Sequence, residues 1–278
     1  MEPSGIALVT GASRGIGRAI AVELAARGFD VVATMRDRSA GAALAAEAAG
    51  AVAATASGGS LRVERLDVTD PATIMIPDGL RVLVNNAGVE APHPPFEDTP
   101  LELWRAMFET NVFGLVEVTR RAIPVLRAAG HGVICNVTSS SILAPVPFYA
   151  PYRASKAAVM AIGESLRAEL APFGIRIVEI MPGPIDTDML ESSDRPADAI
   201  DYPEYAPMAR RMYEGRRQNL AGMITSPADA ARAIADAILD DEAPLRVGCD
   251  PLSIGMLDAW RSTSDEELMR PMLAAWVG

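Results

Sequence analysis

The feature that most constrains the fold is a regular alternation of short apolar segments with segments of helical periodicity, which runs from Ile6 to Val247. Such alternation is typical of a parallel sheet with helices on both faces. The expected strands are residues 6–10, 30–35, 61–66, 82–85, 132–137, 175–180 and 245–247, and the main expected helices are residues 18–27, 40–49, 100–129, 151–171 and 227–239. The sequence therefore predicts an α/β fold: one doubly wound domain over residues 1–278 with a seven-stranded parallel sheet.

Three stretches depart from this alternation. Only eleven residues separate Asp70 from Val82, which is too few for a covering helix, so we expect at most one helical turn between these strands. Residues 186–226, after the sixth strand, are polar and rich in proline, and they predict a lid over a substrate site. Residues 249–278 are too apolar for a disordered tail. This C-terminal extension either closes the substrate cleft or docks on another subunit.

Composition excludes several classes of function. The chain has 36 acidic and 25 basic residues, a net charge of −11, so neither nucleic acid nor an anionic membrane is an expected partner. Two cysteines and two histidines are too few for a disulfide framework or an ordinary metal site, and we expect no metal. The sequence has no signal-peptide pattern and no apolar run of about 18 residues, which favours a cytoplasmic protein.

A glycine-rich turn joins the first strand to the first helix. The segment Thr10-Gly-Ala-Ser-Arg-Gly-Ile-Gly17 has the spacing G-x-x-x-G-x-G. Glycines allow a tight turn and close backbone approach, and the N-terminus of the following helix offers unpaired N–H groups to a pyrophosphate. The turn therefore predicts a dinucleotide site. Its spacing differs from the commoner G-x-G-x-x-G fingerprint.

The chain contains a single lysine, Lys156, among 25 basic residues. This composition suggests that arginine replaced lysine wherever it was tolerated, and that Lys156 occupies a position where arginine fails. Tyr152 lies four residues earlier on the same face of a predicted helix, and Ser139 follows the fifth strand. A lysine ammonium can lower the pKa of a phenol so that it exchanges protons near neutrality. The alternative is an aromatic residue and a cation on a solvated helix face.

Together these motifs resemble the classical short-chain dehydrogenase/reductase family over the chain from Ile6 to about Met189. The resemblance rests on Thr10-Gly11-x-x-x-Gly15-x-Gly17, Asp67, Asn85-Asn86-Ala87-Gly88, Asn111, Ser139, Tyr152-x-x-x-Lys156 and Pro182-Gly183. It implies a Rossmann fold and a hydride-transferring oxidoreductase that interconverts an alcohol and a ketone or aldehyde.

The resemblance also implies roles for individual residues. Tyr152 would exchange a proton with the substrate oxygen, Ser139 would hydrogen-bond that oxygen, and Lys156 would bind the nicotinamide ribose and lower the tyrosine pKa. Asn111 would hold a water that relays protons, which completes the expected catalytic set. The expected cofactor-binding residues are Gly11, Ser13, Arg14, Gly15, Ile16, Gly17, Arg36, Asp67, Val68, Asn86, Ala87, Gly88, Tyr152, Lys156, Pro182, Gly183, Ile185 and Thr187.

The end of the second strand bears on the choice of cofactor. By comparison with the family, the acidic position that marks NAD(H) falls on Met35, and Arg36 can pair with the 2′-phosphate of NADP(H). Arg14 could add a second cation. Asp37 is the competing residue and would favour NAD(H). We expect NADP(H) and keep NAD(H) as the alternative.

Aromatic and thioether side chains near the lid favour a medium-to-bulky apolar substrate, steroid-like or aromatic. The candidate contacts are Val89, His93, Phe96, Ile142, Leu143, Val146, Phe148, Tyr149, Met189, Leu190, Tyr202, Tyr205, Met208, Met212 and Tyr213, although each of them could instead fill the core of the lid. The resemblance further implies a homodimer or homotetramer. The alternatives to this enzyme are a cofactor-sensing protein without catalysis and an NAD-dependent member of the family.

Overall fold

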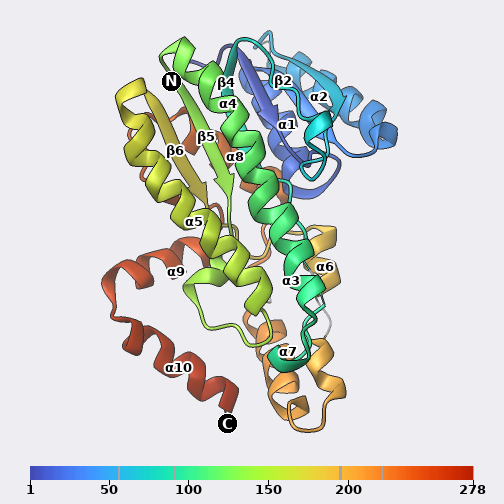
Figure 1. The fold of residues 1–278 in the computed structure, drawn as a ribbon, viewed down its shortest axis with the longest axis vertical. Coiled ribbons are helices and arrows are strands. Elements are labelled where there is room, and N and C mark those ends of the chain that lie inside the picture. The colour runs from blue at the N-terminus through green and yellow to red at the C-terminus, as the bar shows by residue number, and fades with distance from the viewer. Residues whose placement is uncertain (56, 91, 194–195, 221, 278) are drawn as a thin grey trace.

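The computed structural model describes residues 1–278 apart from residues 56, 91, 194–195, 221 and 278. Seven parallel strands form one sheet in the order β3-β2-β1-β4-β5-β6-β7 (Figure 1). Their bounds are β1 Ile6–Val9, β2 Asp30–Met35, β3 Ser60–Arg65, β4 Leu80–Asn85, β5 Gly132–Val137, β6 Ile175–Ile180 and β7 Arg246–Val247. The predicted seven-stranded, doubly wound parallel sheet is confirmed.

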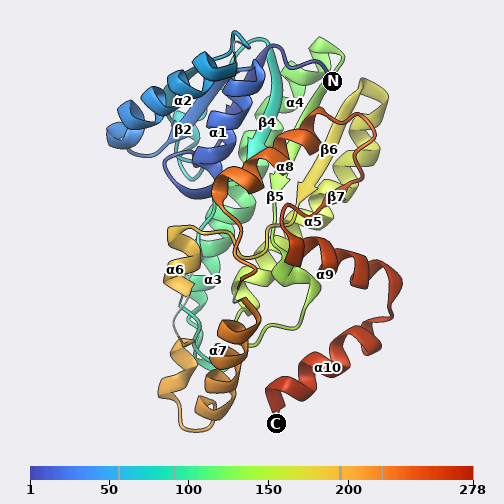
Figure 2. The ribbon, with the colours of Figure 1, turned by 180° about the vertical axis from the view of Figure 1, so that it is seen from behind.

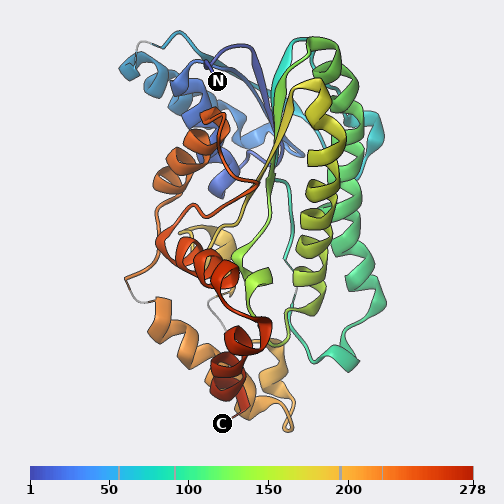
Figure 3. The same cartoon turned by 90° about the vertical axis from the view of Figure 1, so that its left-hand side faces the viewer.

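Helices cover both faces of the sheet, because side chains alternate between its faces along each strand. Helices α1 (Gly15–Arg27), α2 (Gly41–Thr55) and α8 (Pro227–Leu239) share a core with Val9, Val84 and their neighbours. Helices α4 (Leu115–Ala129) and α5 (Ala150–Leu170) pack on the opposite face against Leu8, Leu83 and Ile134. Figures 2 and 3 show the sheet between these two layers.

The connection from β3 to β4 contains a single 3₁₀ turn, η2 (Pro71–Thr73), as its length predicted. Neighbouring elements cover the sheet there: Ile74 is buried in the same core as α4. The Arg121 guanidinium on α4 also donates to the carbonyl oxygens of Pro71 and Ile74, at 2.8 and 3.0 Å.

The expected helix 100–129 is interrupted, so this part of the prediction is wrong. Helix α3 (Leu101–Phe108) is followed by a π-helical turn, η4 (Glu109–Gly114), before α4 begins. Single π-turns widen the backbone ring and frequently occur at functional sites. Asn111 lies in this turn, where its side chain reaches the loop after β4.

Several elements extend past the carboxyl ends of the strands. These are α6 (Asp188–Ser193), η7 (Asp198–Asp201), α7 (Ala206–Leu220), α9 (Pro251–Ser262) and α10 (Asp265–Val277). Figures 1 and 2 show α7, α9 and α10 at the same end of the molecule. Residues 194–195 and 221 of the predicted lid lie outside the described residues.

The start of α9 is attached to the sheet by Asp250. Its carboxylate caps the helix by accepting from the Ser253 backbone N–H at 2.9 Å, and it accepts from the Gly183 N–H at 2.6 Å. The C-terminal extension is therefore attached to the loop after β6. In the part of the chain described here, no helix is long and apolar enough to cross a membrane.

Candidate active site

A cavity of about 930 Å³ lies at the carboxyl ends of the strands. Such a position is where doubly wound sheets bind their ligands, and the volume lies within the usual range of ligand sites. Every residue predicted from the sequence to bind the cofactor lines this cavity: Gly11, Ser13, Arg14, Gly15, Ile16, Gly17, Arg36, Asp67, Val68, Asn86, Ala87, Gly88, Tyr152, Lys156, Pro182, Gly183, Ile185 and Thr187. Ser139 lines it as well, whereas Asn111 lies behind its wall.

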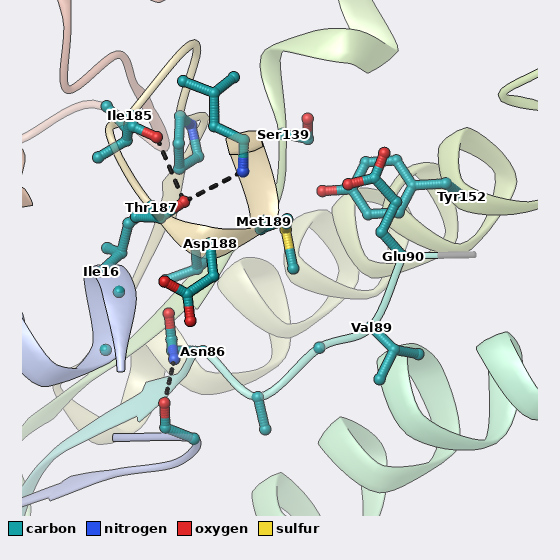
Figure 4. A pocket seen from close by; sticks show the side chains of 18 of the residues that line it. Ile16, Asn86, Val89, Glu90, Ser139, Tyr152, Ile185, Thr187, Asp188 and Met189 are labelled. Atoms are coloured by element: carbon teal, nitrogen blue, oxygen red, sulfur yellow. Dashed lines mark hydrogen bonds between the residues drawn. The ribbon is translucent and has the colours of Figure 1, made fainter. Parts of the chain in front are cut away.

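The glycine turn is attached to the end of β4. The Asn86 side-chain amide donates to the carbonyl oxygens of Thr10 and Gly11, both at 3.0 Å, and the Thr10 hydroxyl accepts from the Asn86 backbone N–H (Figure 4). Gly11 has a φ of +67°, and a Cβ there would lie 2.8 Å from the Cα of Ala87. Position 11 therefore requires glycine for both its conformation and its close approach to the backbone that follows β4.

The N-terminus of α1 faces the cavity. Arg14 caps this helix in an extended conformation and makes no side-chain capping hydrogen bond, so the first N–H groups keep their capacity to bind an anion. The Arg14 guanidinium is exposed and lies 3.3 Å from the Asp188 carboxylate. Thr187 lies against the same turn, since a Cβ on Gly15 would be 3.3 Å from its methyl group, and its hydroxyl donates to the carbonyl oxygen of Ile185 at 3.2 Å (Figure 4).

Tyr152 and Lys156 lie on α5, and Ser139 follows β5, so the three meet at the carboxyl edge of the sheet. The Lys156 ammonium is buried and donates to the Val137 carbonyl oxygen at 2.8 Å. It lies 5.9 Å from the centre of the Tyr152 ring. Burial lowers the pKa of Lys156 to about 8.

The protein surroundings move the pKa of Tyr152 in the opposite direction from that expected. Burial raises this pKa above its ordinary value, and the nearby Glu90 carboxylate raises it further. Hydrogen bonding to Ser139 acts against both effects. The sequence analysis considered the effect of the lysine, whereas the packing of Tyr152 against the lid and the charge of Glu90 appear only in the folded chain.

Asn111 holds the loop that follows β4. Its side-chain oxygen accepts from the Val89 N–H at 2.8 Å, and its amide donates to the Val89 carbonyl oxygen at 2.9 Å and to the Ser155 hydroxyl at 3.0 Å. Only 2% of its surface is exposed, so it contacts the cavity wall from behind. The water-holding role implied by the resemblance stays a prediction.

Beyond the ends of β2 and β3, Arg36 and Asp67 line the cavity. The Thr69 hydrogen bonds and the charge of Arg36 outweigh burial and lower the pKa of Asp67. Met35 is buried at the end of β2. Both carboxylate oxygens of Asp37 accept from Ser39, at 2.9 Å from its N–H and 2.8 Å from its hydroxyl, which caps the next turn.

The remaining part of the cavity is largely apolar. Of the predicted substrate contacts, those that line it are Val89, Val146, Tyr149, Met189, Leu190 and Met212. Phe148 and Tyr205 pack in the small core of the lid, and Phe96 is exposed.

The C-terminal extension adds a wall to the cavity through Leu252, Met256 and Trp276. The Trp276 indole donates to the Pro145 carbonyl oxygen at 3.1 Å. Within the chain, this extension thus contributes to the wall of the cavity, and its docking on another subunit stays a prediction.

Among the polar residues of the cavity that were not predicted are Glu90 on the loop after β4 and Arg216 on α7. Glu90 directly follows the Asn85–Val89 segment, so its place at the end of a strand could have identified it. For Arg216 the sequence carried no signal, because nothing in it indicates which face of α7 turns toward the cavity.

Comparison with known proteins identifies the family of the chain. The sequence model of the short chain dehydrogenase family matches residues 5–198. The chain belongs to the short-chain dehydrogenase/reductase family. It is 41% identical over 212 residues to the uncharacterized oxidoreductase YusZ of Bacillus subtilis, covering 72% of this chain and 74% of that protein.

Other relatives of this dehydrogenase/reductase carry more specific descriptions. The 3beta-hydroxysteroid dehydrogenase 1 of Eggerthella lenta is 34% identical over 232 residues, covering 82% of this chain and 84% of that protein. A short chain dehydrogenase from Burkholderia cenocepacia, solved in complex with NADP, has a TM-score of 0.72 and 25% identity, with 96% of each chain covered.

Proposed function

We propose that this member of the family is an NADP(H)-dependent alcohol dehydrogenase or carbonyl reductase that acts on a medium-to-bulky, mainly apolar substrate. The observation that carries the proposal is the meeting of Ser139, Tyr152 and Lys156 in the cavity that the glycine turn also lines. One side of this cavity has the groups that a dinucleotide needs, and the other side is largely apolar.

The residues present fit a nicotinamide dinucleotide. The uncapped first turn of α1 and the positive φ of Gly11 suit a pyrophosphate held against backbone N–H groups. Asp67 is available to the adenine amino group, and Lys156 to the hydroxyls of the nicotinamide ribose. Structural relatives were solved with NADP and with NADH, which supports this class of cofactor for the chain.

The cofactor supplies or accepts the hydride, and the residues of the chain manage the matching proton. In reduction, Tyr152 donates its phenolic proton to the substrate oxygen as the carbinol C–H bond forms, which leaves a tyrosinate. Ser139 donates a hydrogen bond to the same oxygen and orients it. The Lys156 ammonium stabilises the tyrosinate charge, and in alcohol oxidation each proton movement is reversed.

NADP(H) is favoured by the surroundings of Arg36. The position that carries an acidic residue in NAD(H)-binding relatives is Met35, and its thioether is buried. Asp37, the competing carboxylate, is engaged with Ser39 through both of its oxygens. Arg36 lines the cavity, where a guanidinium can bind a 2′-phosphate bidentately.

The side chains that line the substrate half of the cavity support an apolar ligand. Val146, Met212 and Trp276 form walls without charge, and a steroid or an aromatic ketone presents a matching surface. The similarity to a hydroxysteroid dehydrogenase also supports an apolar, steroid-like substrate. We further propose that the chain forms a homodimer or homotetramer, as the resemblance implies.

The test is Tyr152→Phe, assayed with NADPH and NADH against a panel of ketones and aldehydes and with the oxidised cofactors against alcohols. We expect the loss of the phenolic proton to lower kcat by about a thousandfold or more, with cofactor Kd within about threefold of wild type. A variant that keeps most of its activity would disprove the acid–base role. Tight cofactor binding by wild type without any turnover would instead indicate a cofactor-sensing protein.

A further inference from the structure

A carboxylate lies in the otherwise largely apolar half of the cavity. Glu90 lines this cavity, and 13% of its side chain is exposed. The hydride and proton transfer proposed above does not use it. Figure 4 shows Glu90 and Tyr152 in the same part of the site, and the charge of Glu90 acts on the Tyr152 phenol. A buried carboxylate beside an apolar ligand needs donors, because desolvation of an unpaired charge is costly.

Side chains of the protein fix the position of Glu90. The Nε2 atom of His93 lies 2.9 Å from a Glu90 carboxylate oxygen. The His93 ring stacks on the Tyr149 ring at 3.7 Å between centroids and 16° between planes. The His93 backbone N–H donates to the Asp198 carboxylate at 2.6 Å, which joins this loop to η7. Glu90 is therefore held at a defined point and does not extend freely into the cavity.

The Tyr149 hydroxyl joins the network from the opposite side. It accepts from the Arg216 guanidinium at 3.1 Å. Burial raises the pKa of Tyr149 to about 12; the charge of Glu90 and a hydrogen bond to it add to this effect, and Arg216 opposes it. Arg216 thus reaches the network through Tyr149, whereas Glu90 acts on Tyr152 directly.

Glu90 keeps acceptor capacity toward the cavity. An ionised carboxylate donates nothing and offers about four acceptor positions. His93 and Tyr149 are the donors that the chain provides to it in the described structure, and the carboxylate still forms part of the cavity wall. A ligand group beside the reacting oxygen will thus meet a fixed, negatively charged acceptor.

We propose that Glu90 determines substrate specificity: the substrate carries a hydrogen-bond donor, a hydroxyl or an ammonium, on the carbon next to the reacting carbon, and an anionic group at that position is excluded. This inference rests on the proposed function and narrows its substrate class. The remainder of the substrate stays apolar. The donor completes the hydrogen bonds of Glu90, whereas a carboxylate, sulfonate or phosphate there brings two like charges together in a site shielded from water.

The test uses ketones that differ only next to the carbonyl: acetophenone, 2-hydroxyacetophenone, 2-aminoacetophenone and phenylglyoxylate. We expect wild-type kcat/KM to be at least about tenfold higher for the hydroxy and amino ketones than for phenylglyoxylate. Calorimetric titration of the enzyme–NADP⁺ complex with 1-phenylethane-1,2-diol and with mandelate measures the same preference without turnover. The diol is expected to bind at least about tenfold more tightly.

Glu90→Gln keeps the size and one acceptor oxygen but removes the charge. Because the lost charge also acts on Tyr152, the readout is the ratio of kcat/KM values to that of acetophenone in the same variant: Glu90→Gln should abolish the preference for the amino ketone and relax the exclusion of phenylglyoxylate by about tenfold on this scale. Glu97→Gln is the control, since Glu97 is an exposed carboxylate of the same connecting segment and is not among the residues that line the cavity. It should change none of these ratios.

The outcomes separate this inference from the proposed function. If no ketone is turned over by wild type, the proposed function fails, and the diol-to-mandelate binding ratio still decides the role of Glu90. The inference is overturned if wild type prefers phenylglyoxylate to the hydroxy and amino ketones, or mandelate to the diol, a result that the Arg216 guanidinium would favour. It is also overturned if Glu90→Gln leaves the ratios between these ligands unchanged. If Glu90→Gln does not fold, Glu90→Asp replaces it. This variant keeps the negative charge, so it should still exclude phenylglyoxylate and mandelate, and a loss of that exclusion overturns the inference.

Discussion

Replacing Asn111 with leucine tests whether one buried amide maintains the cavity wall. The substitution keeps a similar side-chain volume but removes all three hydrogen bonds of Asn111, two of them to the Val89 backbone. A backbone N–H and a carbonyl group that lose their partners in a buried setting cost about 1–3 kcal/mol each. We therefore expect the free energy of unfolding to fall by about 2–6 kcal/mol.

The assay is thermal unfolding of the two proteins, followed by circular dichroism. At about 2 °C or more per kcal/mol for a chain of this size, the Tm should fall by at least about 4 °C. Because Val89 lines the cavity, kcat/KM should fall too. Asn85→Leu is the matched control: its amide donates to the side chains of Thr119 and Asn136, both at 2.9 Å, in the core.

The control variant should lose stability yet keep most of its kcat/KM in the temperature range where it stays folded. An Asn111→Leu protein with the Tm and kcat/KM of wild type would refute the reasoning, because two partly buried backbone groups would then lose their partners without measurable cost. A loss of activity equal to that of Asn85→Leu would show that Asn111 acts through stability alone.

Two further predictions follow from other groups. Arg36→Asp should lower the ratio of kcat/KM with NADPH to that with NADH by about tenfold or more. The reason is that a guanidinium that can pair with the 2′-phosphate becomes a carboxylate that repels it, and an unchanged ratio contradicts the assignment of Arg36. Burial raises the pKa of Glu179 to about 7 despite the opposing charge of Arg246, so the folded chain binds this proton more tightly than the unfolded chain does. Stability should thus decrease as the pH rises through about 7. Glu179→Gln should flatten the dependence of Tm on pH between about pH 5 and 8, and equal slopes of Tm against pH for wild type and variant would contradict this.

Much of the fold could be predicted because its signals are local. The apolar runs of β2, β5 and β6 begin and end at the predicted residues, since buried parallel strands are apolar along their whole length. The π-turn at 109–114 could not be predicted, because it accompanies a contact between Asn111 and Val89, which belong to separate segments. Helical periodicity alone does not distinguish it from a continuous helix.

The same distinction applies to the site. The position of Gly11, Tyr152 and Lys156 at the cavity could be predicted, because the motifs that contain them have short spacings along the chain. The direction of the Tyr152 pKa depends on burial and on Glu90, and both arise only once the lid and the loop after β4 enclose the phenol. The position of Arg216 could not be predicted for the same reason, since its helix meets the cavity through tertiary packing.

The wall formed by Trp276 has a consequence for how the substrate range of such a chain can change. The family match ends at residue 198, whereas Met212, Met256 and Trp276 lie beyond it and border the same chamber as Tyr152. The distal stretch thus supplies part of the cavity wall, while Tyr152 and Glu90 lie inside the matched stretch. Exchanging the distal stretch between relatives should therefore change that part of the wall without altering Tyr152 or Lys156.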